Sequence, residues 1–234
     1  MRNYDPKKYI KLVENSDFPL LRKFMKDELD FLNRQIEHKN SIIDLGSGYG
    51  RIIPYVKEIC NEYWGVEINK LMYNELERRA LKTSNIKTIN GDITNLGEII
   101  STNNVPKDDS LYLLLQNTIG TIEGDRYSLL KELRILLKYK SAELVISFFK
   151  SSYLKTIGLE MFKSISDMVG EPDFSKCDFE NGLFVSNTDY VAKWWSDEEI
   201  FEIIDLLNAK VVSYKEDDEY IIFRLKRKQN EKYN

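Results

Sequence analysis

The chain has 234 residues, of which 42% are hydrophobic and 31% are charged, and its formal net charge is −4 at neutral pH. This length and apolar content can build one sizeable α/β domain with a small lid. The acidic balance disfavours nucleic-acid binding, which usually needs a basic surface, and no apolar segment nears the ~18 residues of a membrane span.

The two cysteines, Cys60 and Cys177, are far apart, and neither has a spacing typical of metal ligands. We therefore expect two free thiols, a reducing cytoplasmic environment and no metal site.

Residues 1–40 are predicted to form a helical arm. Apolar side chains recur at helical spacing over residues 6–14 and 19–38. Because this arm precedes the first core strand, it must pack on the sheet or cap a ligand site.

A glycine-rich segment at 44–50, Asp-Leu-Gly-Ser-Gly-Tyr-Gly, follows the apolar run 41–43. Glycines at alternate positions let a ligand approach the main chain closely. The next residues, 51–57, indicate a helix, with Pro54 near enough to its start to be tolerated. Strand, glycine turn and helix together are typical of the nucleotide-binding corner of a doubly wound α/β sheet.

The glycine spacing differs from that of dinucleotide sites. Those sites use G-x-G-x-x-G around a pyrophosphate, whereas Arg51 stands here at the position of the third glycine. Asp44 would repel a pyrophosphate, but it can accept hydrogen bonds from an ammonium group or through water. A tight turn without any ligand is the alternative interpretation.

Each of the next three predicted strands also ends in a polar side chain, at the edge where open α/β sheets bind ligands. The strands are 63–67, 86–90 and 110–115, and the side chains are Glu67, Asp92, Gln116 and Asn117. Glu67 is placed to accept both hydroxyls of a ribose. Asp92 is expected to accept from the exocyclic amine of an adenine, with Ile68 and Ile93 packing on the ring faces.

The second half of the chain completes the sheet. A helix capped by Asp125 is predicted over 125–139, and a fifth strand over 142–149. The capping-box pattern at 196–199 opens a late helix. Two antiparallel strands are expected at 211–214 and 219–225.

Residues 170–195 do not fit this core pattern. Asn181-Gly182 is typical of a two-residue hairpin turn. An aromatic hairpin here would rise over the strand ends and wall a substrate site. Alternatively, its tryptophans only fasten the hairpin to the sheet. The candidate substrate-site residues are Tyr9, Phe149, Tyr190, Trp194 and Trp195.

The motifs at 44–50, 66–69, 91–93 and 116–120 resemble those of class I methyltransferases that use S-adenosylmethionine. The last segment is similar to that of small-molecule N-methyltransferases of the glycine and sarcosine type. The resemblance implies a doubly wound, seven-stranded, mostly parallel sheet with an antiparallel last strand. Residues 1–40 would be a helical cap and 41–234 the methyltransferase domain, with 170–195 as an inserted lid.

The resemblance also implies how S-adenosyl-L-methionine is held. The three glycines of the 44–50 segment would pass under its methionine part, Asp44 would contact its amino group, Glu67 the ribose and Asp92 the adenine. The expected cofactor-binding residues are Asp44, Gly46, Ser47, Gly48, Tyr49, Gly50, Glu67, Ile68, Asp92, Ile93, Gln116 and Asn117.

The implied activity is methyl transfer to a small molecule, with nitrogen favoured as the acceptor. An amine needs only to arrive unprotonated, whereas a hydroxyl needs a base, and the only histidine, His38, is expected to face solvent. Asn117 is the candidate for contacting the nucleophile or orienting the cofactor. A protein or RNA methyltransferase and a non-catalytic binding module are the alternatives, and the oligomeric state is left open.

Overall fold

A computed structural model of the protein describes residues 6–35, 37–56, 59–81, 83–122 and 125–228. Its first half contains α1 (Pro6–Glu14), α2 (Pro19–Gln35), β1 (Lys39–Leu45), α3 (Ile53–Val56), β2 (Cys60–Glu67), α4 (Lys70–Ala80), β3 (Ile86–Asn90), η1 (Ile93–Asn95), α5 (Leu96–Thr102), β4 (Ser110–Leu114) and α6 (Thr118–Thr121). Its second half contains α7 (Arg126–Leu136), β5 (Glu143–Phe149), η2 (Ser151–Tyr153), η3 (Leu154–Gly158), α8 (Leu159–Ser164), α9 (Ser166–Val169), β6 (Leu183–Val185), β7 (Val191–Lys193), α10 (Asp197–Leu206), β8 (Ala209–Glu216) and β9 (Tyr220–Arg227).

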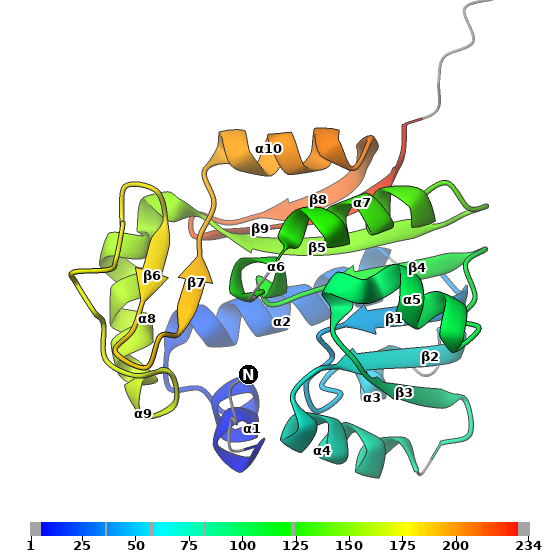
Figure 1. The fold of residues 1–234 in the computed structure, drawn as a ribbon, viewed down its shortest axis with the longest axis horizontal. Coiled ribbons are helices and arrows are strands. Elements are labelled where there is room, and N and C mark those ends of the chain that lie inside the picture. Colours follow the sequence, from blue (N-terminus) through cyan, green and yellow to red (C-terminus); the bar gives the residue numbers. More distant parts are fainter. Residues whose placement is uncertain (1–5, 36, 57–58, 82, 123–124, 229–234) are drawn as a thin grey trace, which may run out of the picture.

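The central sheet has seven strands in the order β3-β2-β1-β4-β5-β9-β8 (Figure 1). The first five strands pair in parallel, whereas β9 runs antiparallel to β5 and β8 antiparallel to β9. The central parallel strands are apolar runs because helices cover both of their faces. The predicted doubly wound, seven-stranded sheet with an antiparallel end is therefore confirmed.

Helices form a layer on each face of the sheet. Successive strand residues point to opposite faces, so Ile42 packs into one apolar core and Ile43 into the other. The first core also contains side chains of α2, α3 and α4, and the second contains those of α5, α7 and α10. The arm helix α2 is thus part of the core of the sheet.

The predicted helix starts agree with the structure more closely than the predicted ends do. Asp125 caps α7 by accepting from two backbone N–H groups, and Ser196 and Glu199 form the predicted capping box of α10. The helix predicted to reach residue 38 ends as α2 at Gln35, with residue 36 outside the described residues, and His38 is an exposed loop residue. The helix predicted over 51–57 is the shorter α3, and residues 57 and 58 lie outside the described part.

The 170–195 segment contains a hairpin, but its turn is not at Asn181-Gly182. Strands β6 and β7 pair antiparallel around residues 186–190. Asn181-Gly182 instead lies in the turn between the bridged residues Asp178 and Leu183. A Cβ on Gly182 would collide with the Trp194 carbonyl oxygen, so close approach of two backbones explains this glycine.

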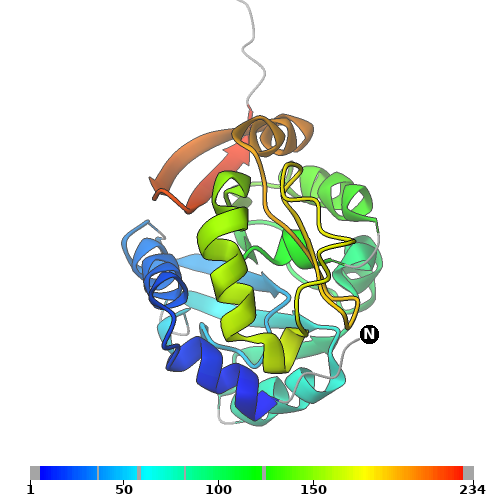
Figure 2. The same ribbon diagram turned by 90° about the vertical axis from the view of Figure 1, so that its left-hand side faces the viewer.

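The hairpin and α8 lie across the near end of the molecule in Figure 2, with α1 and α2 beside them. This is the end to which the parallel strands point, because Trp195 N–H donates to the carbonyl of Phe149, the last residue of β5. The expected hairpin over the strand ends is therefore present.

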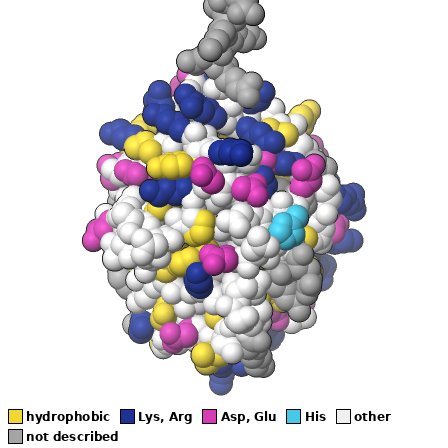
Figure 3. All heavy atoms as spheres, turned by 90° about the vertical axis from the view of Figure 1, so that its right-hand side faces the viewer, with side chains coloured by type: hydrophobic (Ala, Val, Ile, Leu, Met, Phe, Trp, Pro, Cys, Tyr) yellow, Lys and Arg dark blue, Asp and Glu magenta, His cyan; other side chains and the backbone are white. Residues whose placement is uncertain are grey.

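Figure 3 shows the opposite side of the molecule, where Lys and Arg are interspersed with Asp and Glu. Among the described residues, no helix is long and apolar enough to cross a membrane.

A cluster of charges around the buried Glu143 carboxylate holds the β1, β5 and β9 strands together. The Glu143 carboxylate, which is 1% exposed, accepts from Lys39 Nζ at 3.1 Å, Arg224 Nε at 2.6 Å and Lys226 Nζ at 2.9 Å. Burial alone would raise the pKa of Glu143, but these three cations lower it to about 2.

This depressed pKa predicts an acid-dependent loss of stability. The ionised Glu143 should stabilise the fold fully above its unfolded pKa near 4.5 and progressively less as the pH falls toward 2. The difference in unfolding free energy between the wild type and Glu143→Gln should therefore shrink by about 1 kcal/mol between pH 6 and pH 3.5. Urea denaturation measures it, and a pH-independent difference would contradict the assignment.

Candidate functional site

The glycine loop, residues 44–50, joins β1 to the turn before α3. Gly46, Gly48 and Gly50 all have left-handed backbones, with φ of 79°, 56° and 80°. Only glycine adopts this conformation without steric cost. The backbone N–H groups of Gly46 and Ser47 donate to the carbonyl of Val66 on the neighbouring strand at 2.9 and 3.0 Å. The loop is therefore a rigid cradle fastened to β2.

Asp44, the first residue of this loop and the last but one of β1, is 5% exposed. Its carboxylate accepts a 2.6 Å hydrogen bond from the Tyr63 hydroxyl of β2. Burial raises the pKa of Asp44 to about 7, against the lowering effects of that hydrogen bond and of the Arg51 charge. A cationic ligand group beside Asp44 would favour its ionised form.

Glu67, at the end of β2, bridges two backbone segments. Its carboxylate accepts from the N–H of Gly48 at 2.8 Å and from the N–H of Asn69 at 2.7 Å. Burial raises its pKa, and these two bonds oppose that rise. Glu67 therefore fixes the middle of the glycine loop. Its contact with a ribose stays a prediction.

The remaining predicted cofactor residues have different surroundings. Asp92 accepts from the Thr94 N–H at the start of η1 and is half-buried. Ile68 is 39% exposed, whereas Ile93 is buried in the second core. Ile68 is thus accessible to a ligand ring, and the Ile93 side chain mainly packs against the sheet.

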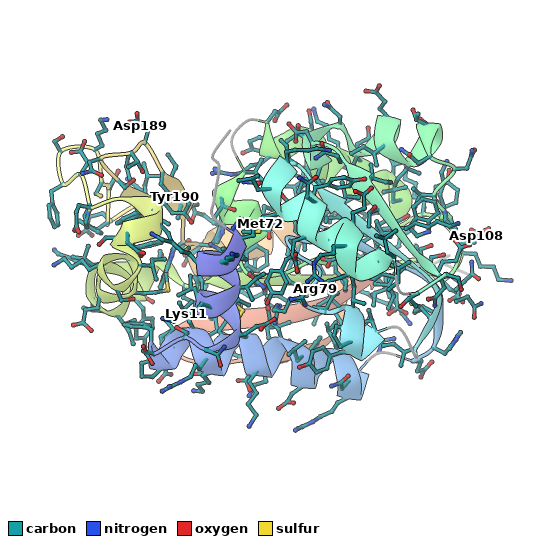
Figure 4. The ribbon with its side chains drawn as sticks, turned by 90° about the horizontal axis from the view of Figure 1, so that it is seen from below. Lys11, Met72, Arg79, Asp108, Asp189 and Tyr190 are labelled. Atoms are coloured by element: carbon teal, nitrogen blue, oxygen red, sulfur yellow. The ribbon has the colours of Figure 1, made fainter. Side chains whose placement is uncertain are left out.

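Tyr49 points away from the sheet and anchors the loop to the helices. It is buried against Val13 of α1 and Met72 of α4, and its ring lies 4.5 Å from the Arg79 guanidinium. Figure 4 shows α1 between α4, which carries Met72 and Arg79, and the segment that carries Tyr190.

The tip of β4 is strained. Gln116 and Asn117 both have left-handed backbones, with φ of 56° and 54°, which is uncommon for residues other than glycine. The Asn117 side chain accepts from Trp195 Nε1 at 3.0 Å and donates to the Lys193 carbonyl at 2.9 Å. Asn117 therefore positions the hairpin, and a contact of its amide with a methyl acceptor stays a prediction.

A carboxylate from the arm supports this tip. Glu28 of α2 is fully buried and accepts from the Gln116 N–H at 2.6 Å, from the Ser147 hydroxyl at 2.7 Å and from Arg51 Nη2 at 2.6 Å. It therefore connects the arm to β4, to β5 and to the residue that follows the glycine loop.

The Gln116 amide continues this network to α1. In the orientation that satisfies its hydrogen bonds, the Gln116 amide oxygen accepts from Arg51 Nε at 2.6 Å. The amide nitrogen then donates to the Tyr9 hydroxyl at 2.8 Å. The Tyr9 ring also lies over the loop, because a Cβ on Gly48 would be 3.9 Å from Tyr9 Cε1. The arm thus covers the glycine loop from above.

Beside the β4 tip lies a cavity of about 100 Å³, which we call the aromatic cavity. It brings together four of the five predicted substrate residues, and Gln116 and Asn117 also line it. The four are Tyr9, Phe149, Tyr190 and Trp194. Trp195, the fifth, faces the other core and lines a separate groove between α7 and α10.

The sequence interpretation missed several residues of this site, above all Glu28 and Phe162. Glu28 follows Phe24 by four residues and precedes Leu32 by four, so helical spacing places it on the buried face of α2. A lone carboxylate on an apolar helix face was the available signal. Phe162 carried no comparable signal.

Comparison with solved structures identifies similar folds. A protein from Pyrococcus horikoshii OT3 matches with a TM-score of 0.66 at 16% identity over 94% of this chain and 99% of its own. An S-adenosylmethionine-dependent methyltransferase from Clostridium acetobutylicum ATCC 824 matches with 0.61 at 14% identity over 94% and 96%.

The 1,6-didemethyltoxoflavin-N1-methyltransferase of Burkholderia thailandensis, solved with 1,6-didemethyltoxoflavin and S-adenosylhomocysteine, matches with a TM-score of 0.61 at 11% identity, over 96% of this chain and 87% of its own. At these identities the likeness establishes a shared fold. No family model and no curated protein sequence matches the chain.

The Glu28 network predicts a large stability effect. Glu28→Ala should lower the unfolding free energy by about 3 kcal/mol, because it leaves a buried guanidinium and a strained backbone N–H without their acceptor. Glu28→Gln, which keeps one acceptor oxygen, should cost less. Thermal denaturation measures both, with Glu202→Ala, at an exposed position of α10, as a control expected within ~0.5 kcal/mol of wild type. Equal melting temperatures for Glu28→Ala and the control would contradict this role.

Proposed function

We propose that the chain is an S-adenosyl-L-methionine-dependent methyltransferase that acts on nitrogen in a small molecule. The observation that carries this proposal is the left-handed glycine loop with Asp44, Glu67 and Asp92 arranged around it at three adjacent strand ends. The solved methyltransferases with the same fold support it.

The residues present fit this cofactor. The glycine loop offers backbone without Cβ bulk for close approach of the methionine part, and Asp44 would face its ammonium group. Glu67 stands where the ribose hydroxyls would lie, and half-buried Asp92 stands where the adenine amine would lie.

The bound cofactor would supply a methyl group already activated by its positive sulfur. The protein then has to hold the acceptor in line and keep water out. The aromatic cavity would provide this enclosure next to the loop, since Tyr9 both lines the cavity and lies over Gly48. Tyr9 covers the loop, and the Asn117 amide fixes the hairpin that forms the opposite wall.

Calorimetry with S-adenosylhomocysteine tests cofactor binding. Asp44→Asn and Asp92→Asn should each weaken binding about ten- to a hundredfold, the effect of losing a hydrogen bond to a charged group. Asp108→Asn serves as a matched control because Asp108 lies at the far end of the sheet (Figure 4). Undetectable wild-type binding at millimolar ligand would refute the proposal.

The raised pKa of Asp44 predicts pH-dependent affinity. A carboxyl with a pKa of about 7 becomes about tenfold more ionised between pH 6 and pH 8, and only the ionised form attracts an ammonium group. S-adenosylhomocysteine should therefore bind up to about tenfold more tightly at pH 8 than at pH 6. Asp44→Asn should remove this pH dependence of affinity. A wild-type affinity that does not change with pH would contradict a contact between Asp44 and the amino group of the ligand.

Turnover distinguishes an enzyme from a binding module. Release of S-adenosylhomocysteine on incubation with small nitrogen compounds, aliphatic or heteroaromatic, and none with RNA, would support a small-molecule enzyme. Tight cofactor binding without turnover toward these nitrogen compounds, peptides or RNA would favour the non-catalytic alternative.

A further inference from the structure

The walls of the aromatic cavity are mostly hydrocarbon. The side chains that close it are fully or almost fully buried and come from α2, β5, α8 and the end of β7. They include Leu21, Phe24, Phe149, Met161, Phe162 and Trp194. A ligand in this cavity loses most of its water, so its own polarity decides whether it can bind.

The polar groups that line the cavity are neutral. Among the described residues they are the amides of Gln116 and Asn117, the hydroxyls of Tyr9, Thr121 and Tyr190, and the buried indole N–H of Trp194. Burying an ionised group costs several kcal/mol unless an opposite charge pairs with it. These side chains offer hydrogen bonds to a dipole rather than a counter-charge.

The aromatic rings are arranged for stacking. Phe149 and Trp194 stack on each other at 4.6 Å and 20°, and Phe162 and Phe184 stack at 3.8 Å and 13°. Because one face of each ring is covered by its partner, these pairs form apolar surfaces, and a flat apolar molecule packs against such a surface without leaving a charge unpaired.

The nearby carboxylates of Glu28 and Asp44 do not line the cavity, and each already accepts a hydrogen bond. Glu28 and Arg51 lie behind Gln116 and pair with each other, and Glu28 also accepts from the Gln116 N–H. Asp44 accepts from Tyr63. A protonated amine in the cavity would have to draw one of these carboxylates away from its donors.

We infer that the methyl acceptor is a small, uncharged heteroaromatic compound that reacts through a weakly basic ring nitrogen. This inference rests on the proposed function and narrows its substrate class. A volume of about 100 Å³ lies below the ~300–1,000 Å³ of pockets for drug-sized ligands, which favours one or two rings.

Methyl transfer to such an acceptor needs no base. The nitrogen lone pair forms the new N–C bond to the sulfonium methyl carbon while the S–C bond breaks and leaves its electron pair on sulfur. The positive charge passes from sulfur to nitrogen. A pyridine-type nitrogen carries no proton, so none has to be removed, whereas an aliphatic ammonium must first lose one.

Pyridine and piperidine form a matched pair of probes, because they share a six-membered ring but only piperidine is protonated at neutral pH. Titration is followed by the indole N–H resonance of Trp194 in two-dimensional NMR. Trp194→Phe identifies that signal among the three tryptophans. Pyridine should shift it at concentrations at least about tenfold lower than piperidine, a difference of ~1.4 kcal/mol.

A charged substitution in the cavity lining tests whether the lining determines the preference for pyridine over piperidine. Leu12 lines the cavity from α1 and is only half-buried, so it tolerates a polar side chain better than the core residues do. Leu12→Glu should reverse the preference toward piperidine, whereas Leu12→Gln should not. Tighter binding of piperidine to wild type, or no Trp194 shift with either probe, would overturn the inference.

The titration is run with and without S-adenosylhomocysteine. Failure of the proposed function appears as absent cofactor binding in calorimetry and leaves the preference for pyridine intact. Failure of this inference appears as a lost or reversed preference while the cofactor still binds.

Discussion

The buried carboxylate of Glu28 is the interaction on which the candidate site depends. It joins four segments that are remote in sequence: α2, the tip of β4, β5 through Ser147 and, through Arg51, the end of the glycine loop. The tip holds two consecutive left-handed residues, a conformation that persists only where its surroundings enforce it. By accepting the Gln116 N–H, Glu28 supplies that constraint. The arm is thus structurally inseparable from the strand ends.

This arrangement concentrates negative charge. Glu28, Asp44 and Glu67 are all buried around the glycine loop, and among the described residues Arg51 is the cation paired within this group. The mutual repulsion contributes to the raised pKa of Asp44. A positively charged ligand group beside Asp44 would relieve this repulsion, whereas a pyrophosphate would increase it. The electrostatics of the folded site therefore agree with the glycine spacing in disfavouring a pyrophosphate.

The strands, the glycine loop and the helix caps were predictable because short-range patterns determine them. Contacts between residues that are far apart in the sequence were not predictable in this way. Helical spacing places Glu28 on a buried face, yet nothing local indicates that its acceptor oxygen meets the N–H of Gln116, 88 residues away. Asn181-Gly182 misled for the same reason, since Gly182, with φ of 66°, lies in the turn between Asp178 and Leu183 and against the Trp194 backbone, and not in the turn that joins β6 to β7. The aromatic cavity likewise depends on contacts between distant segments.

Adjacent tryptophans explain how the hairpin can both wall the cavity and fasten itself to the sheet. Neighbouring residues of an extended chain point to opposite sides. Trp194 stacks on Phe149 within the cavity wall, while Trp195 packs on Phe148 in the other core and donates to Asn117. Because the fastening side chain also holds the strained β4 tip, any shift of the hairpin would disturb that tip. A wall coupled in this way is preformed, so under the proposed function it would select the methyl acceptor by shape and polarity.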